Sequence, residues 1–270
     1  MTHTGFEPHG LTKKVTRLYP PPAREIPAEA IYEDLELPPK GSQDPSRPYV
    51  VINMVSSVDG KAAIEGKASS IGDRIDRRAM RNLRSKADAV MIGANTLRAE
   101  KVSLGLDHSG PQPLAIILTE TGDIPLESKL VGFGRQQVLV VAPRRSAERF
   151  SGRARVLAAP TTPSGAIDLA EVLRMLRADY GVATLLVEGG PVLNHALISH
   201  GLTDELFLTL APKLIGGLPD QAPTILKGQL FSAEVCSSLR LISIYLAGSE
   251  LFLRYSLSLT GELPERHYHD

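Results

Sequence analysis

Short apolar runs alternate with helix-like segments along most of the chain, from Tyr49 to about residue 258. Runs of this length and composition are typical of strands buried on both faces of a sheet. Eight strands are predicted in this way, over residues 49–55, 87–94, 114–119, 137–143, 183–189, 205–212, 238–246 and 251–259. Helices or long crossovers separate the first five, so these five strands are predicted to be parallel.

The spacing of apolar residues predicts two helices between these strands. The first has an apolar stripe that recurs every four positions, at Ile75, Ala79, Leu83 and Ala87. The second covers residues 167–180, and Gly181 is placed to end it. Residues 247–250 have the composition of a tight turn, so the last two strands are expected to form an antiparallel hairpin at the edge of the sheet.

The segment before the first strand has a different composition. Residues 1–48 are rich in proline and charge, with one short possible helix at residues 28–35, and are interpreted as an N-terminal arm lying on the surface or on a partner. Residues 49–258 are predicted to form one α/β domain, and residues 259–270 a C-terminal tail. The expected fold class is therefore α/β, with a mostly parallel sheet flanked by helices and an antiparallel C-terminal hairpin.

Composition narrows the possible functions. The chain has 30 basic and 30 acidic residues, so it has no overall positive charge with which to bind nucleic acid. The single cysteine, Cys236, excludes an internal disulfide and a zinc site of several cysteines. No window approaches the roughly 18 consecutive apolar residues of a membrane span, and the first residues do not resemble a secretion signal. The expectation is a cytoplasmic protein that acts on a small molecule and binds neither membrane nor nucleic acid.

The sequence LLVEGGPVLNH contains the strongest candidate site. Its apolar strand stops at Glu188, turns on Gly189 and Gly190, and enters a helix at Pro191. Free backbone N–H groups and the positive end of a helix dipole then lie at a strand end, where α/β proteins bind phosphate groups. A plain tight turn is an equally good interpretation of two glycines alone. A carboxylate directly beside a phosphate site also requires an explanation.

Two other predicted strands end in polar residues. The second strand runs into Gly93 and a small polar loop, in which Asn95 or Thr96 either caps a short helix or contacts a ligand. Two glycine turns at strand ends of one sheet are suited to a single elongated ligand such as a dinucleotide. The first strand ends in a polar group that would line the same edge, and its members are Asn53, Ser56, Ser57 and Asp59. Asp59 either belongs to a turn, orders a loop or supplies a proton.

Charged residues elsewhere leave alternatives open. The first helix carries five arginines, most of which are expected in solvent, although one or two facing the cleft would bind a substrate phosphate. Arg144 and Arg145 follow the fourth strand and are either surface charge or readers of the 2′-phosphate of NADPH. The histidines His108, His195 and His200 lack partners at metal-ligand spacing, so no metal site is predicted. Hydrolase and nucleotide triphosphatase motifs are absent from the sequence.

Three blocks of the sequence together resemble a known family. VSSVDGKAA, LRSKADAVMIGANTLRAE and LLVEGGPVLNHALISHGLTDELFLTLAPKLIGG are similar, in this order and spacing, to the reductase domain of bacterial riboflavin biosynthesis. The resemblance spans Tyr49 to Tyr255 and implies the dihydrofolate reductase fold, NADPH as cofactor and a homodimer. The implied reaction is the reduction of 5-amino-6-(5-phosphoribosylamino)uracil to its ribitylamino product, with hydride transferred to C1′ of the opened sugar.

The resemblance also implies roles for individual residues. A first group would lie on the cofactor side: Ser56, Thr96, Glu100, Thr119, Gly189, Gly190, Pro191, Val192, Leu193 and Asn194. Arg144 is the candidate for the 2′-phosphate from its position after the fourth strand, not from the resemblance. A second group would lie on the substrate side: Asn53, Ser57, Arg84, Leu104 and Glu188. Glu188 would accept hydrogen bonds from pyrimidine N–H groups, and Arg84 would bind the ribose phosphate. Asp59 and Glu188 are the candidate catalytic residues.

The sequence departs from the family in two blocks. A Ser-x-Trp-Ile-Thr block is replaced by residues 69–73, and an Asp-Asp-Pro-x-Leu-Thr-x-Arg block by residues 100–107. The last arginine of the second block, expected to bind the substrate phosphate, is therefore missing. Either Arg74, Arg98 or Lys101 replaces it, or the substrate lacks that phosphate. The alternatives are a reductase of another pterin or pyrimidine such as dihydrofolate, or a non-catalytic NADP-binding protein.

Overall fold

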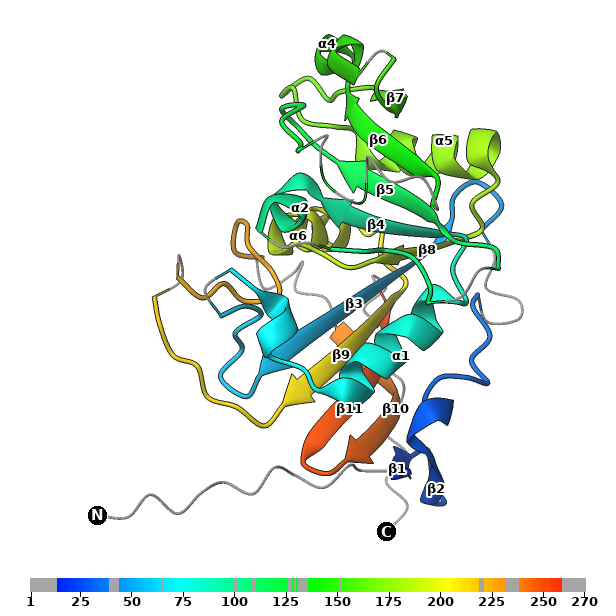
Figure 1. Ribbon diagram of the computed structural model, residues 1–270, viewed down its shortest axis with the longest axis vertical. Helices are drawn as coiled ribbons and strands as arrows, with labels where there is room; N and C mark the ends of the chain where they lie inside the picture. Colours follow the sequence, from blue (N-terminus) through cyan, green and yellow to red (C-terminus); the bar gives the residue numbers. More distant parts are fainter. Residues whose placement is uncertain are drawn as a thin grey trace.

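The described part of the computed structural model is built around one large mixed sheet (Figure 1). The structure describes residues 14–38, 44–64, 66–99, 102–107, 110–125, 128, 130, 136–150, 152–218, 221–231 and 238–258. Within these residues the sheet has eleven strands in the order β2-β1-β10-β11-β9-β3-β8-β4-β5-β6-β7. The predicted C-terminal tail, residues 259–270, lies outside the described residues, as do Glu100, Lys101, His108 and Cys236.

The parallel half of the sheet confirms the predicted strands. It contains β3 (Tyr49–Ser57), β8 (Thr184–Val187), β4 (Ala89–Gly93), β5 (Leu114–Leu118), β6 (Val138–Pro143) and β7 (Arg155–Ala159). Neighbouring strands in this series are all parallel. The hydrophobic pattern does not predict β7. This edge strand has only five residues, RVLAA, and they are partly exposed, so they do not form a continuous apolar run.

The antiparallel half contains the predicted hairpin and two further strands. β10 (Ser238–Ala247) pairs with β11 (Glu250–Ser258), and β11 pairs with β9 (Glu205–Ala211). The hairpin is not the edge of the sheet, because β1 (Lys14–Tyr19) pairs with β10 and β2 (Arg24–Pro27) pairs with β1. Part of the segment interpreted as an arm therefore extends the sheet. Its strands are short and mostly exposed, so they lack the apolar runs by which the others were found.

The possible helix at residues 28–35 is only a single 3-10 turn, η1 (Ala28–Ala30). Tyr32 has a positive φ of 61°, which ends any helical path there. Ile31 and Tyr32 are nonetheless buried, and Tyr32 packs edge-on against Phe207, with their ring centroids 5.0 Å apart. This segment is therefore tied to the core of the domain.

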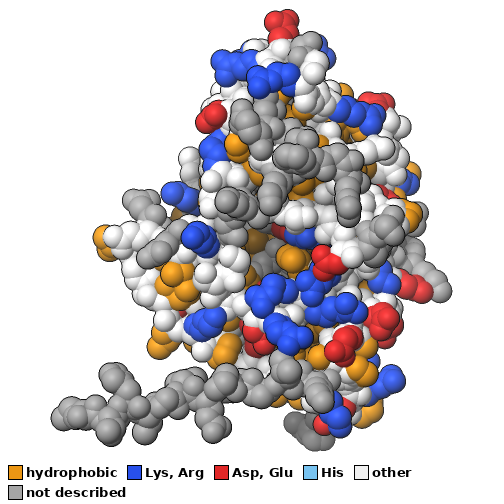
Figure 2. All heavy atoms as spheres, viewed as in Figure 1, with side chains coloured by type: hydrophobic (Ala, Val, Ile, Leu, Met, Phe, Trp, Pro, Cys, Tyr) orange, Lys and Arg blue, Asp and Glu red, His pale blue; other side chains and the backbone are white. Residues whose placement is uncertain are grey.

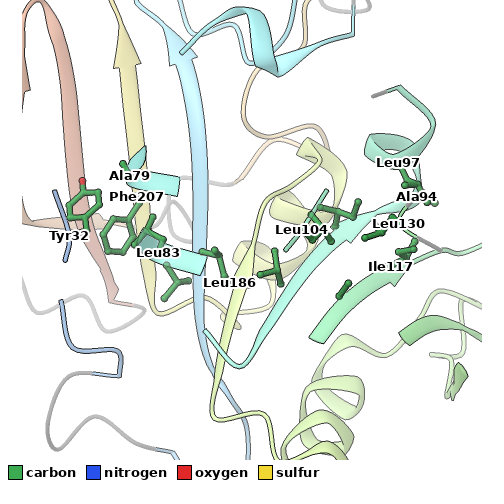
Figure 3. Close-up of a cluster of buried hydrophobic side chains, with 14 of the residues drawn as sticks. Tyr32, Ala79, Leu83, Ala94, Leu97, Leu104, Ile117, Leu130, Leu186 and Phe207 are labelled. Carbon is green, nitrogen blue, oxygen red and sulfur yellow. The ribbon is translucent and has the colours of Figure 1, made fainter. Parts of the chain in front are cut away.

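Helices cover both faces of the parallel half. The first face carries α1 (Arg74–Arg84) and α2 (Ala94–Ala99), whose apolar residues belong to the buried cluster shown in Figure 3. The second face carries α5 (Leu169–Tyr180) and α6 (Pro191–Ser199), which pack into a separate cluster. Each fully buried Leu or Ile contributes roughly 1.5–3 kcal/mol, so the two clusters fix the sheet between the helices. As predicted, Gly181 ends α5 in a left-handed conformation.

The remaining described helical segments are short. They are η2 (Ala68–Ser70), α4 (Arg144–Ala147) and η3 (Glu148–Phe150). Over the described residues, none of the helices is long and apolar enough to cross a bilayer.

Candidate functional site

A buried ion pair lies where β8 ends. The Arg84 guanidinium binds the Glu188 carboxylate in a bidentate manner, with Nε to Oε1 and Nη2 to Oε2 distances of 2.7 Å each. The two side chains are only 7% and 11% exposed. Arg84 Nη1 also donates to the carbonyl oxygens of Ser103 and Gly105. Arg84 thus joins the end of α1, the end of β8 and the loop at residues 102–107.

The pleat of β8 decides the direction of Glu188. Leu186 belongs to the cluster under α1, whereas Val187 belongs to the cluster under α6. Since side chains alternate along a strand, Glu188 lies on the α1 face, where its partner Arg84 is found. The glycine turn that follows leads into α6 on the opposite face. The carboxylate and the start of α6 are therefore on different sides of the sheet.

The two glycine turns anticipated from the sequence are in direct contact. Gly93 N donates to Gly189 O over 2.8 Å, which joins the ends of β4 and β8. The peptide bond between Gly189 and Gly190 is cis, and Gly189 has a φ of +82°. A Cβ at Gly189 would lie 3.2 Å from Met54 Sδ, and a Cβ at Gly190 would lie 3.1 Å from Thr96 Oγ1. Side chains at these positions would fill the space above the turn.

The start of α6 has the properties of a phosphate-binding turn. Gly190 is its N-cap residue, no side chain caps it, and Pro191 occupies the first helical turn. The first backbone N–H groups of α6 therefore lack a side-chain acceptor, and the helix dipole favours an anion there. The Leu193 side chain is buried, so this residue would act through its backbone N–H. Asn194 is also buried, but its N–H donates to Gly190 O over 3.0 Å, so it is not free for a ligand. Asn95 and Thr96 both lie within α2, so neither residue caps that helix.

The end of β3 is held by hydrogen bonds to a distant loop. Asp59 accepts from Ser57 Oγ over 2.6 Å, from Ile215 N over 3.1 Å and from Gly216 N over 2.6 Å. These hydrogen bonds lower the pKa of Asp59 to about 2. A carboxyl group with this pKa is ionised at neutral pH and cannot serve as a proton donor. The geometry supports the loop-ordering alternative for Asp59.

The other predicted residues of this edge differ in accessibility. Asn53 lies on the α1 face, since it is in register with the core residue Phe207 of β9. Ser56 is 4% exposed and donates to Ser57 O. Leu104 is fully buried in the core cluster, so its side chain positions the loop and is not accessible to a ligand.

The candidate residues for the far end of a cofactor lie further along the sheet. Thr119 follows β5 and its hydroxyl accepts from Gly122 N, while the exposed Arg144 begins α4 after β6. The ends of β8, β4, β5 and β6 are adjacent in this order. Neighbouring strands are roughly 4.8 Å apart, so three spacings give about 14 Å, which suits an extended dinucleotide. Glu100 cannot be placed, because it lies outside the described residues.

Sequence reasoning missed two carboxyl groups beside α1, the half-buried Asp76 and the buried Glu250. Burial, together with the nearby Asp73 and Glu188 carboxylates, raises the pKa of Asp76 to about 6, although a Thr209 hydrogen bond opposes the shift. Burial and the Asp73 carboxyl raise the pKa of Glu250 to about 9. An aspartate in a first helical turn resembles a solvent-exposed dipole partner. Only the packing of α1 against β9 distinguishes Asp76 from such a residue.

Comparison with known proteins identifies relatives over most of the chain. Residues 48–253 match the family model described as the RibD C-terminal domain. A 2,5-diamino-6-ribosylamino-4(3H)-pyrimidinone 5′-phosphate reductase from Methanothermobacter thermautotrophicus is 29% identical, over 78% of this chain and 99% of that protein. A protein of the same name from Aquifex aeolicus is 27% identical, over 78% of this chain and 97% of that protein.

A solved structure shares the fold. Acinetobacter baumannii RibD matches with a TM-score of 0.66 and 25% sequence identity, over 79% of this chain and 59% of that chain. The chain thus spans about three fifths of the length of this RibD. The mostly parallel sheet with its antiparallel strands and flanking helices is therefore the fold of a known group of reductases.

Proposed function

Because the chain belongs to the RibD C-terminal domain family, we propose that it is a reductase of riboflavin biosynthesis that uses NADPH to reduce a ribosylaminopyrimidine 5′-phosphate. The observation that carries this proposal is the position of Glu188. It ends β8 on the α1 face, while the glycine turn beside it opens α6 on the other face. One strand end thus offers a carboxylate to a nitrogen-rich ring and free N–H groups to phosphates.

Glu188 suits a pyrimidine even though Arg84 already binds both of its oxygens. A carboxylate has about four lone-pair positions, and the bidentate arginine uses only two. Arg84 keeps the carboxylate ionised and oriented, so that the remaining lone pairs can accept from ring N–H and amino groups. Two neighbouring donors on the substrate would match two neighbouring acceptor atoms.

The names of the relatives and the hydrogen bonds that Glu188 can accept both indicate which pyrimidine is the substrate. The Methanothermobacter and Aquifex relatives, which align over nearly their whole length, are named for the 2,5-diamino pyrimidinone. That ring carries an N3–H beside its 2-amino group, which gives two adjacent donors for Glu188. The uracil form has an oxygen at C2 in place of this amino group, so its adjacent donors are N1–H and the 6-amino N–H, on the side that carries the sugar. We therefore infer that the diamino compound is preferred over the uracil compound implied by sequence resemblance alone.

NADPH would bind at the same strand ends, on the side opposite the Glu188 side chain. The N–H groups at the start of α6 would hold its pyrophosphate, Thr96 would lie beside it, and Arg144 would reach the 2′-phosphate. When bound, NADPH supplies the hydride that reduces C1′ of the opened sugar. Asp59 and Ser57 would keep the loop containing Ile215 and Gly216 against the end of β3, where the two ligands would meet. The proton would come from water or from the substrate, since Asp59 is ionised.

Oxidation of NADPH tests this function directly. The purified protein is incubated with NADPH and, separately, with the diamino pyrimidinone phosphate, the uracil phosphate and dihydrofolate. The expected result is fastest turnover of the diamino compound, with a ribitylamino product identified by mass spectrometry. Turnover of dihydrofolate alone would replace this proposal with a folate reductase. Binding of NADPH without turnover of any of the three would indicate a non-catalytic binding protein.

We also infer that the protein is a cytoplasmic homodimer. One sheet face in the antiparallel half bears a row of half-buried apolar side chains, here called the leucine face: Leu208, Leu210, Leu241, Ile244, Leu246, Leu251 and Leu253. An apolar area of this extent is typical of a protein interface, and an identical copy presents the same area. Leu253→Arg is expected to convert a dimer into a monomer in light scattering. An unchanged mass would refute this use of the leucine face.

A further inference from the structure

The contacts of α1 give each of its sides a different neighbour. Ile75, Ala79 and Leu83 pack into the core. On one flank, Arg78 Nε donates to the Glu29 carbonyl, and Asn82 Nδ2 donates to the carbonyls of Glu29 and Ile31. This flank is therefore directed at the N-terminal segment. The opposite flank carries Asp76 and Arg84, which face Thr209 of β9 and Glu188 of β8.

Two further arginines continue the line that ends at Arg84. Residues 77, 81 and 84 have the i, i+4, i+7 spacing of a single helix stripe. The Arg77 side chain makes no hydrogen bond or ion pair with the residues that the structure describes, although its charge acts on the neighbouring Asp76 carboxyl group. Arg81 Nε lies 3.4 Å from Asp107 Oδ2, with the two side chains 36% and 80% exposed. Figure 2 shows Lys and Arg side chains gathered over α1, below a hollow in this face of the molecule.

Asp107 supplies the carboxylate that pairs with Arg81. It occupies the position at which the family resemblance leads one to expect an arginine for the substrate phosphate. Here a carboxylate would repel that phosphate, but it pairs with Arg81 of the facing helix. The loop that carries Asp107 is held against α1 by Arg84 through the Ser103 and Gly105 carbonyls. In this chain the positive charges near the loop are therefore on the helix.

We propose that Arg77 and Arg81 bind the 5′-phosphate of the substrate, and that Arg81 exchanges its exposed partner Asp107 for the phosphate. This inference rests on the proposed function for the identity of the ligand. A pyrimidine on Glu188 lies beside Arg84, and Arg77 lies seven residues before Arg84, about 10 Å along the helix axis. The opened sugar would run along α1 between these points. An exposed pair such as Arg81–Asp107 is weak, and a phosphate dianion is a stronger bidentate acceptor.

The other cations considered for this role are less suitable. Arg84 already makes four hydrogen bonds to Glu188, Ser103 and Gly105. Arg98 interacts with Asp123 and Asn95, toward the end of β5. Arg74 is ten residues before Arg84, about 15 Å along the helix axis, so it lies further from Glu188 than Arg77 and Arg81 do. Lys101 lies outside the described residues.

Binding of ribose 5-phosphate tests this inference without any need for turnover. Titration calorimetry would compare the unmodified protein, the Arg77→Gln/Arg81→Gln double variant and Arg78→Gln. The control variant Arg78→Gln removes one positive charge, where the double variant removes two, from the same helix but on the opposite flank. We expect the double variant to weaken ribose 5-phosphate binding by roughly 100-fold, about tenfold for each charged contact, and the control to weaken it less than threefold. Thermal unfolding would verify that each variant is folded.

Kinetics provide the second readout. The double variant should raise KM for the phosphorylated pyrimidine and leave KM for the enzymatically dephosphorylated compound unchanged. Asp107→Asn should instead lower KM for the phosphorylated form. Equal effects of the double variant and of Arg78→Gln on ribose 5-phosphate binding would overturn the inference. If binding is lost selectively but no pyrimidine is turned over, the phosphate site stands and the proposed function fails. If turnover is normal and binding is unaffected, the function stands and this site is wrong.

Discussion

Replacing Glu188 by Gln tests whether this carboxylate has both a structural and a substrate-binding role. Breaking a buried ion pair by removing one partner typically costs about 3–5 kcal/mol. Glutamine keeps one acceptor oxygen for Arg84, so the cost here should lie at the lower end, about 3 kcal/mol. For a domain of this size, about 3 kcal/mol corresponds to a fall in Tm of roughly 6–12 °C. We also expect kcat/KM for the pyrimidine to fall sharply while the Kd for NADPH stays nearly constant.

A matched control separates these two roles. Glu205 forms a similar bidentate pair with Arg254, with distances of 2.8 and 2.7 Å, at the amino end of β9. Glu205→Gln should destabilise the protein by a comparable amount without changing KM for the pyrimidine. Denaturant unfolding of Glu188→Gln, Arg84→Met and the double variant should also give a coupling free energy of about 2 kcal/mol or more. The reasoning is refuted if Glu188→Gln leaves stability unchanged, or if it weakens NADPH binding as much as turnover.

Three further predictions concern single residues. The pKa of Asp76 is raised to about 6 from an ordinary value near 4, so folding favours the protonated carboxyl group. The stability that this protonated group contributes is therefore lost as the pH rises from about 4 through 6. Asp76→Asn should therefore raise the free energy of unfolding by about 2–3 kcal/mol at pH 8 but hardly at pH 4 in urea titrations, and an equal effect at both pH values would contradict this. Asp59→Asn should speed amide hydrogen exchange at Ile215 and Gly216, and unchanged exchange would show that Asp59 does not anchor their loop. Gly190→Ala should leave the fold intact but weaken NADPH binding at least tenfold in fluorescence titrations. The reason is that the added methyl group would occupy the space above the turn. Unchanged affinity would exclude this turn as the phosphate site.

Much of the fold could be predicted because the central strands are buried on both faces. Such strands are continuous apolar runs, so the strands from β3 to β6 and the β10–β11 hairpin are evident without a structure. β1, β2 and β7 could not be found in this way. They lie toward the two edges of the sheet, where one face or one side remains in solvent and selection for apolar residues is weak. Their pairing depends on the strands beside them, which are distant in the sequence.

The site was predictable as a location but not as a set of contacts. Carboxyl ends of parallel strands meet at one edge, so the clustering of Glu188, Thr96 and Ser57 follows from the strand order. The Arg84–Glu188 pair joins residues 104 positions apart, and Asp59 binds a loop 156 positions away. Long-range pairs of this kind depend on side-chain direction and on the twist of the sheet. Neither property can be obtained from local periodicity.

The conflict between a carboxylate and a phosphate site at Glu188 is resolved by the two-residue period of a strand. Val187 and Glu188 necessarily point to opposite faces, so whichever helix covers Val187 cannot cover Glu188. Since α6 packs on the side of Val187, the turn proposed to bind phosphates leads to the face opposite the Glu188 side chain. A shift of one residue between Val187 and Gly189 would place the carboxylate against the N-terminus of α6. An alanine inserted after Val187 should therefore abolish both the pairing with Arg84 and NADPH binding, even if the domain still folds.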